Sequence, residues 1–320
     1  MKMLAQAYLT TGNFAGAQAV ADEVGKIEGQ GVAANQIQGA VFAARNNFES
    51  SVSSFKRAYE LSPSDVQPMV ALVRTYLRAG KIKDALAFMK SVVAASPNNL
   101  DAHLLLGQLY LQAGEKDAAL QSFRSVIERD PKNMSAYQNL FSLYLGDRRY
   151  EEADKIIGQG LAAVPNDFGL RLSRASLLEL TGKIDEAINL YEVLIKEKPS
   201  SEIVANNLAS LLTDYRTDQA SLKRANDLAQ RLKKSDIPQY KDTLGWASYK
   251  VGKFDEASAV LKSAAEKQPD LAVLYYHQGM TEIALSNKEA ARKSLQKALD
   301  MAKDQPFPQL DLAKKALQDL

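Results

Sequence analysis

Prolines recur along this chain of 320 residues at a fixed spacing, which constrains the fold more than any other feature. Five of the ten prolines are separated by successive intervals of 34 residues, and a sixth follows two periods and two residues later. They are Pro63, Pro97, Pro131, Pro165, Pro199 and Pro269. Proline lacks an amide donor and disfavours helix at the residue before it, so we expect each one to end a helix. The Ser, Asp and Asn residues beside each proline can cap the helix that follows. A period of this size indicates a solenoid or another stacked array.

Small and large residues keep the same register. We number each unit so that its proline is position 32. Position 20 is small in eight units: Ala17, Ser51, Ala85, Ala119, Ala153, Ala187, Ala257 and Ala291. Position 8 is also small, with Gly39, Gly107, Gly245 and Gly279, or Ala5, Ala175 and Ala209. Position 24 is large: Phe55, Met89, Phe123, Ile157 and Tyr191. Position 15 is glycine in five units, Gly12, Gly80, Gly114, Gly182 and Gly252, where a turn needs positive φ. This pattern predicts pairs of helices that cross closely at the small residues.

The pattern resembles the tetratricopeptide repeat (TPR) over almost the whole chain. The resemblance implies an all-α, right-handed superhelical α-solenoid of about nine helix–turn–helix repeats, with the first helices lining a concave groove. The predicted repeats span residues 1–31, 32–65, 66–99, 100–133, 134–167, 168–201, 202–237, 238–271 and 272–305. The segment after them, 306–320, predicts an amphipathic capping helix, with Leu310, Ala313, Leu317 and Leu320 on one side.

Two places depart from the pattern. The repeat at 202–237 has a longer turn, and its small residue moves to Ala225, so we expect a protruding loop there. Met1 falls near position 4 of its repeat, which suggests that the chain is the C-terminal part of a longer protein; a natural start with a short first helix is the alternative.

Composition narrows the possible functions. The formal net charge is only +2, so the chain lacks the excess of basic residues that would indicate binding to nucleic acid. There is no cysteine and there are only two histidines, which excludes thiol chemistry, Cys-ligated metals and a three-His metal centre. We predict no cofactor. No apolar run is long enough to predict a transmembrane helix, so we expect no direct membrane insertion of this chain.

The resemblance places positions 2, 5, 9, 12 and 13 of each first helix on the groove, where we expect a protein or peptide to bind. Trp and Tyr supply rigid contact area there, and Asn can hydrogen-bond a peptide backbone. The alternative is that Trp246 and its neighbours only pack between helices. The predicted contact residues are Arg74, Arg78, Gln108, Gln112, Gln138, Asn206, Ser210, Asp214, Asp242, Trp246, Tyr249 and Tyr276.

Several tempting motifs are better explained by structure. The G-x-G-x-x-A strings at 29–34 and 158–163 lack the strand and helix context of a dinucleotide site. Repeat arithmetic brings His277 near Asp242, but no nucleophile accompanies them, so a buried, hydrogen-bonded histidine is the better interpretation. No three consecutive repeats supply the Lys, Asn and Arg set with which some TPR proteins hold a chaperone's C-terminal carboxylate. Because neither the glycine strings nor the pair of His277 and Asp242 supplies catalytic groups, we predict that the chain is not an enzyme.

A narrower resemblance concerns the last third. The phrases NNLASLL, DTLGWASYKVGKFDEA and YYHQGM, in this order, are similar to bacterial TPR proteins of envelope and exopolysaccharide systems, notably TPR lipoproteins of the PEP-CTERM/exosortase system. This resemblance implies a scaffold for envelope assembly, polysaccharide export or protein sorting, periplasmic and tethered to the outer membrane in the full-length protein. A cytoplasmic location remains open. One alternative is that the array is the substrate-recognition arm of a larger enzyme, such as a glycosyltransferase or protease. Another is self-association through the uncovered first repeat.

Overall fold

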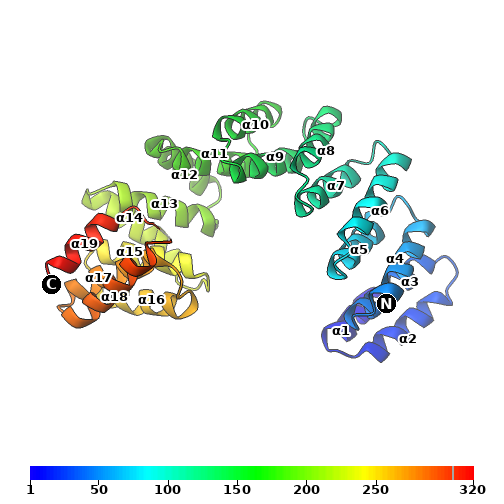
Figure 1. The fold of residues 1–320 in the computed structure, drawn as a ribbon, viewed down its shortest axis with the longest axis horizontal. Helices are drawn as coiled ribbons and strands as arrows, with labels where there is room; N and C mark the ends of the chain where they lie inside the picture. Colours follow the sequence, from blue (N-terminus) through cyan, green and yellow to red (C-terminus); the bar gives the residue numbers. More distant parts are fainter. Residues whose placement is uncertain (305) are drawn as a thin grey trace. The chain divides into compact units, whose positions relative to one another are not determined.

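The fold is a series of helical hairpins, as Figure 1 shows for a computed structural model that describes residues 1–304 and 306–320. Every regular element in these residues is a helix, so the prediction of an all-α repeat fold is confirmed. Residue 305, the predicted end of the last repeat, lies outside the described residues. The chain divides into two compact units, Met1–Pro165 and Asn166–Leu320. The 34-residue pattern runs through this boundary without a break, so the division is not predicted from the sequence.

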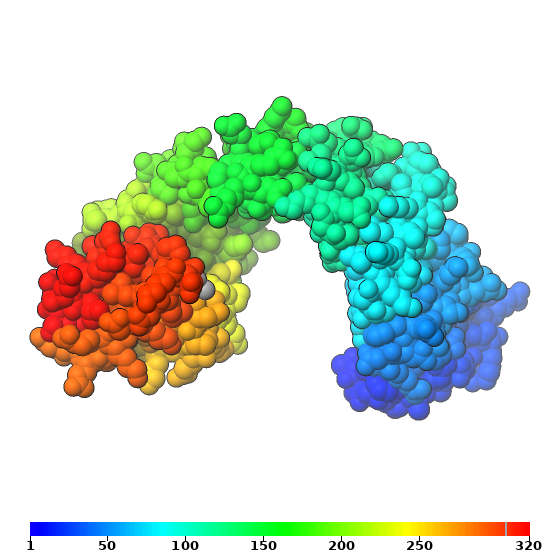
Figure 2. Space-filling model, viewed as in Figure 1, coloured from blue at the N-terminus to red at the C-terminus, as the bar shows by residue number. Residues whose placement is uncertain are grey.

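The first unit consists of antiparallel helix pairs, and successive pairs form adjacent bands of its surface (Figure 2). Its helices are α1 (Lys2–Thr10), α2 (Phe14–Gly25), α3 (Gly31–Ala44), α4 (Phe48–Leu61), α5 (Val66–Arg78), α6 (Ile82–Ala95), α7 (Leu100–Gln112), α8 (Lys116–Arg129), α9 (Met134–Gly146) and α10 (Tyr150–Ala163).

The second unit continues the same arrangement and adds a short 3-10 helix, η1, and a final helix, α19. Its helices are α11 (Phe168–Leu180), α12 (Ile184–Glu197), α13 (Glu202–Tyr215), α14 (Gln219–Ala229), η1 (Gln230–Leu232), α15 (Pro238–Lys250), α16 (Phe254–Lys267), α17 (Ala272–Ala284), α18 (Lys288–Met301) and α19 (Leu310–Gln318). In both units the odd-numbered helices up to α17 are the first helices of their pairs. We call the surface they present the first-helix face of each unit.

Four of the hairpins have a close approach between a glycine at position 8 and the large residue at position 24. A Cβ atom added to Gly107 would lie 2.5 Å from the ring of Phe123, and one added to Gly245 would lie 2.5 Å from Leu261 Cγ. Cβ atoms essentially never approach another atom so closely, so a larger residue at either position would force the neighbouring side chain to move. The large residue of each hairpin is buried, with Phe123 and Leu261 both 0% exposed. The register of small and large residues in the sequence therefore reports this packing.

The turns and caps explain the remaining repeat positions. Gly114, at position 15, has a φ of +78°, and Asn46, Arg148 and Ser286 hold the same position with φ values of +57°, +57° and +62°. Asn99 and Asn133, two residues after their prolines, cap the first helices that follow: Asn99 Oδ1 accepts from the Ala102 amide at 3.0 Å and Asn133 Oδ1 from the Ala136 amide at 3.1 Å. Proline and cap together end one helix and start the next.

The prediction of a protruding loop at 202–237 is wrong. Only three residues, 216–218, separate α13 from α14, as in the other hairpins. The additional residues instead lengthen the helices at the turn, so that fully buried Ala225 comes at the seventh residue of α14, whereas Ala119 is the fourth residue of α8. Helical continuation satisfies the backbone amides and carbonyls that a loop would leave to solvent. Asp218 caps the start of α14 through the Ser221 amide at 2.9 Å.

The final helix covers the last repeat of the second unit. Ala313 of α19 is fully buried, and Leu310, Leu317 and Leu320 pack against the same apolar cluster. Phe307, just before α19, is 8% exposed and packs on Tyr276 of α17, with the ring centroids 5.7 Å apart. The segment therefore occupies the apolar face that α17 and α18 would otherwise expose.

Candidate functional site

In the first unit, the first-helix face contains two hollows where predicted contact residues meet. Arg74 and Arg78 line a hollow of about 450 Å³ together with residues from α1 and α3. Arg74, Gln108 and Gln112 line a second hollow of about 230 Å³ between α5 and α7. Gln138, on α9, is exposed but lines neither hollow. The structure thus brings four of the five predicted residues of this unit together.

In the second unit, the predicted contacts form a tightly packed band. Trp246 and Tyr276 are 6% and 3% exposed, and Asp242 is 9% exposed. Asn206, Ser210 and Tyr249 are half-buried, whereas Asp214 remains exposed. The side chains predicted to offer the most contact area are therefore mostly covered by their neighbours, as the packing alternative expects. A role in ligand contact remains a prediction for this unit.

The aromatic residues of this band stack on one another. The Trp246 ring lies parallel to the rings of Tyr249 and His277, with centroid distances of 4.6 Å and 4.2 Å. Lys250 Nζ lies 4.9 Å from the centroid of the Trp246 ring, a cation–π contact. Trp246 Nε1 donates a hydrogen bond of 3.2 Å to Asp214 Oδ1, which joins α15 to α13. The stack holds one large side chain between three consecutive first helices.

His277 and Asp242 form a buried pair. His277 Nδ1 and Asp242 Oδ1 are 2.7 Å apart, and His277 is 5% exposed. The interpretation of His277 as a buried, hydrogen-bonded histidine is confirmed. The other ring nitrogen, Nε2, is also buried and has no partner among the described residues. The pair links α15 to α17 within the packed band.

Next to this band lies a network around a tyrosine hydroxyl. The Tyr191 hydroxyl donates to Glu179 Oε2 at 3.1 Å, accepts from Asn207 Nδ2 at 3.0 Å, and lies 3.1 Å from Ser176 Oγ. Sequence reasoning assigned Tyr191 only to packing, at position 24. A tyrosine at a position that is otherwise apolar was the available signal, because a buried hydroxyl needs partners.

Burial raises the pKa of several residues in the packed band and in the network around Tyr191. Loss of solvent raises the pKa of Tyr191 to about 12 and that of Tyr276 to about 12. Desolvation by the surrounding protein likewise raises the pKa of the Glu179 carboxyl above its usual range. Perturbed carboxyls on an accessible face occur at functional sites, but ion-pair and hydrogen-bond networks that only support the fold perturb them too.

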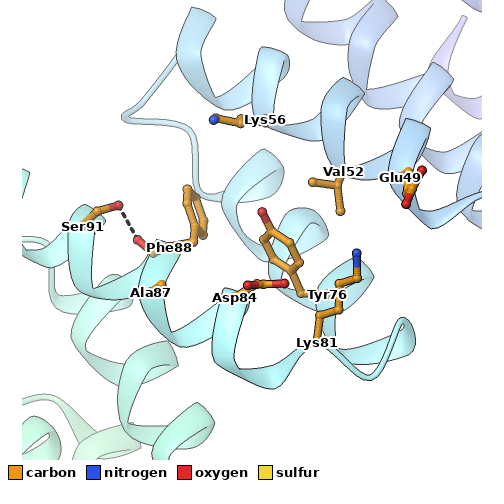
Figure 3. A pocket seen from close by; sticks show the side chains of 9 residues that line it. All are labelled: Glu49, Val52, Lys56, Tyr76, Lys81, Asp84, Ala87, Phe88 and Ser91. Atoms are coloured by element: carbon orange, nitrogen blue, oxygen red, sulfur yellow. Dashed lines mark hydrogen bonds between the residues drawn. The ribbon is translucent and has the colours of Figure 1, made fainter.

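A third hollow, of about 600 Å³, lies outside the first-helix face and was not predicted. Figure 3 shows it between α4 and α6, with Tyr76 near its centre and Val52 and Phe88 on either side. Both charge signs line it, Lys56 and Lys81 as well as Glu49 and Asp84. All but Tyr76 and Lys81 belong to second helices, which the repeat pattern marks only through their packing positions.

Within residues 1–304 and 306–320, no three or more His, Asp or Glu side chains gather as a metal site would require. In the same part of the chain, no helix is both long and apolar enough to cross a bilayer.

Comparison with known families decides what the hairpins are. One sequence model of the tetratricopeptide repeat family matches residues 76–143, and a second matches residues 2–66, 139–202 and 243–306. The second alone covers more than half of the chain. The chain belongs to the tetratricopeptide repeat family. TPR arrays are in general protein-interaction scaffolds and are typically non-catalytic.

Similar proteins agree with this assignment at the level of the fold. TPR repeat-containing protein PA4667 of Pseudomonas aeruginosa is 28% identical over 120 residues, which is 38% of this chain and 20% of the relative. The matching segment thus spans one fifth of that protein. Among solved structures, the APC/C hetero-tetramer Cut9–Hcn1 gives a TM-score of 0.60 at 14% identity, covering 93% of this chain and 58% of the other. Yeast Tom70 gives a TM-score of 0.51 at 16% identity, covering 92% of this chain and 65% of the Tom70 chain.

Proposed function

We propose that this chain is a non-catalytic scaffold that binds a segment of a partner protein on the first-helix face of its first unit. The observation that carries the proposal is the convergence of predicted contact residues from α5 and α7 on two hollows of the first unit. These hollows are formed almost wholly by first helices, and their lining mixes amides and cations with apolar residues. Amide side chains can pair with a peptide backbone, and apolar hollows can accept its side chains.

Site-specific photo-crosslinking in extracts of the native cell tests this proposal. A photoreactive amino acid replaces Ala40 or Gln108 on the first-helix face of the first unit, and Lys56 or Gln159 on second helices as matched controls. We expect discrete adducts from Ala40 and Gln108 and none from the controls. Equal labelling from the second helices would overturn the proposal.

For the cellular role, we propose bacterial envelope assembly, exopolysaccharide export or protein sorting, of the PEP-CTERM/exosortase type. The supporting observation is the order of phrases in the last third of the sequence, NNLASLL, DTLGWASYKVGKFDEA and YYHQGM. We expect the full-length protein in the outer-membrane fraction, facing the periplasm, and cross-linked partners that belong to the envelope. Recovery in the cytosolic fraction with cytosolic partners would contradict this role.

The second candidate is the recognition arm of a larger enzyme, such as a glycosyltransferase or protease. The matching segment is only 20% of the Pseudomonas relative, so repeats of this kind can belong to a much longer chain. A catalytic domain in the same gene would support the arm, whereas a signal peptide followed by a lipidated cysteine would support the envelope scaffold.

A further inference from the structure

The larger of the two hollows on the first-helix face of the first unit is lined by cations and amides. Lys2, Arg74 and Arg78 supply positive charge, Gln6, Gln36 and Gln67 supply amides, and the lining includes no carboxylate. The rest of its lining is uncharged and includes Ala40, Ala43, Ala44 and Ala71. This hollow therefore presents a positive surface, whereas the hollow in Figure 3 carries both signs.

The cations of this hollow are not neutralised by the protein. Arg78 Nη2 donates to Asn46 Oδ1 at 3.3 Å, and its guanidinium carbon lies 5.4 Å from the centroid of the Phe48 ring. Lys2 Nζ donates to Gln36 Oε1 at 2.6 Å. Arg74 is exposed and forms no ion pair with any described carboxylate. All partners of the first two cations are thus uncharged, and three positive charges remain available to a ligand.

The carboxylate that touches this lining is already engaged. Asp65 Oδ2 accepts from Gln36 Nε2 at 3.5 Å. Asp65 Oδ1 accepts from the backbone N–H of Gln67 at 2.9 Å and so caps α5. A carboxylate at a helix N-terminus is stabilised by the helix dipole as well as by the cap. Asp65 therefore serves the fold of α5 and leaves the arginines free.

Arg74 also borders the second hollow, whose character is different. This hollow is lined by apolar side chains from α5 and α7, and its other polar groups are Gln108 and Gln112. The apolar residues are Val70, Val73, Leu77, Leu105 and Leu109. A positive surface and an apolar hollow thus lie side by side on one first-helix face and share one arginine.

We propose that the first unit binds an acidic peptide segment that also carries aliphatic side chains. Glutamate or aspartate side chains of the segment pair with Arg74 and Arg78, which lie one turn apart on α5, and an adjacent aliphatic side chain enters the hollow between α5 and α7. Guanidinium groups bind carboxylates through two parallel hydrogen bonds, which gives such contacts both strength and direction. The inference rests on the proposed function, because it names the chemistry of the partner that the first-helix face takes.

Three short synthetic peptides test this chemistry, all acetylated and amidated so that none has a free terminal carboxylate. The first contains glutamate and leucine, the second glutamine and leucine, and the third glutamate and serine. Binding is measured by fluorescence anisotropy at low and high salt. We expect the glutamate–leucine peptide to bind at least about tenfold more tightly than either other peptide. The glutamine peptide lacks the charge-assisted contacts, and the serine peptide lacks the buried aliphatic side chain. Its affinity should fall with salt, because exposed charges are screened.

A double variant locates the site. R74Q with R78Q removes two charges from the first-helix face, and K56Q with K81Q removes two charges from the hollow in Figure 3 as a matched control. We expect the arginine variant to lose about tenfold in affinity for the glutamate–leucine peptide and the control to stay within about twofold. Circular dichroism checks that both variants remain folded, since all four side chains lie on the surface.

Equal binding of the glutamine and glutamate peptides, or an equal loss in the lysine control, would overturn the inference. These outcomes are distinguishable from failure of the proposed function. If photo-crosslinking still labels Ala40 and Gln108 selectively, the face binds a partner and only its acidic character is wrong.

Discussion

The first-helix faces of the two units use the same repeat positions with opposite results. At position 9, the first unit has Ala40, Arg74 and Gln108, and all three line open hollows. The second unit has Trp246 at the same position, and its ring packs against Tyr249, Tyr276 and His277. The backbone is the same hairpin in both. Whether a TPR face is open or filled therefore depends on side-chain size at a few positions that the scaffold does not constrain.

The largest expected effect comes from removing the Trp246 side chain from the packed first-helix face of the second unit. Trp246→Ala removes the stack and leaves Asp214 without its indole partner, and we expect a loss of about 3–5 kcal/mol in the free energy of unfolding. The matched control is Arg74→Ala, at the same repeat position of the first unit, which should change stability by less than about 0.5 kcal/mol. Urea denaturation measures both. Similar losses for the two variants would show that the faces do not differ in their role in stability.

The next prediction asks whether the hairpins themselves are equivalent in the two units. Gly107→Ala and Gly245→Ala each place a methyl group 2.5 Å from a buried side chain, and we expect both to cost about 1–3 kcal/mol. Gly158→Ala is the control, because its Cβ would meet nothing within 4 Å and should stabilise α10 by about 0.5–1 kcal/mol. Thermal unfolding followed by circular dichroism provides the measurement. A neutral Gly107→Ala would refute the close approach in the first unit.

A smaller effect should appear as pH dependence in the second unit. The pKa of Glu179 is raised in the folded state, so its proton is held more tightly there than in the unfolded chain. The associated stability is complete below the unfolded pKa and is lost as pH rises through the folded pKa. Glu179→Gln retains an oxygen that accepts from Tyr191 and should raise stability near neutral pH by about 1 kcal/mol or less.

The measurement is the urea midpoint of this variant against pH, with Glu186→Gln, a change in the first turn of α12, as the control. The gain for Glu179→Gln should shrink as the solution is acidified. A gain that stays constant from acidic to neutral pH would exclude titration of Glu179 as its cause.

The smallest expected effect concerns the turns, which should behave alike in both units. Arg148 holds a φ of +57° that costs an L-residue energy, so Arg148→Gly should stabilise the first unit by less than about 1 kcal/mol. Gly252→Ser in the second unit, where φ is +80°, should destabilise that unit. Differential scanning calorimetry of the two variants compares them directly. Shifts of the same sign would contradict a common turn geometry.

The sequence predicted the scaffold because each repeat position has a steric cause that recurs. Gly107 and Phe123 are sixteen residues apart, as are the corresponding glycine and large residue of the comparable hairpins, and their sizes can be read without knowing the fold. The burial of Trp246 was harder to predict, because its neighbours include Tyr276 and, through Tyr276, Phe307 from a segment outside the repeats. The extended start of α14 was missed because an added turn of helix and an added loop have the same length in sequence.

The contact between position 8 and the bulky side chain at position 24, closest where position 8 is glycine, is made inside a single repeat. Substitutions on the exposed side of a first helix therefore leave this contact within the hairpin unchanged. Such an architecture separates persistence of shape from choice of ligand, so that recognition can evolve one hairpin at a time while the rest of the array continues to work.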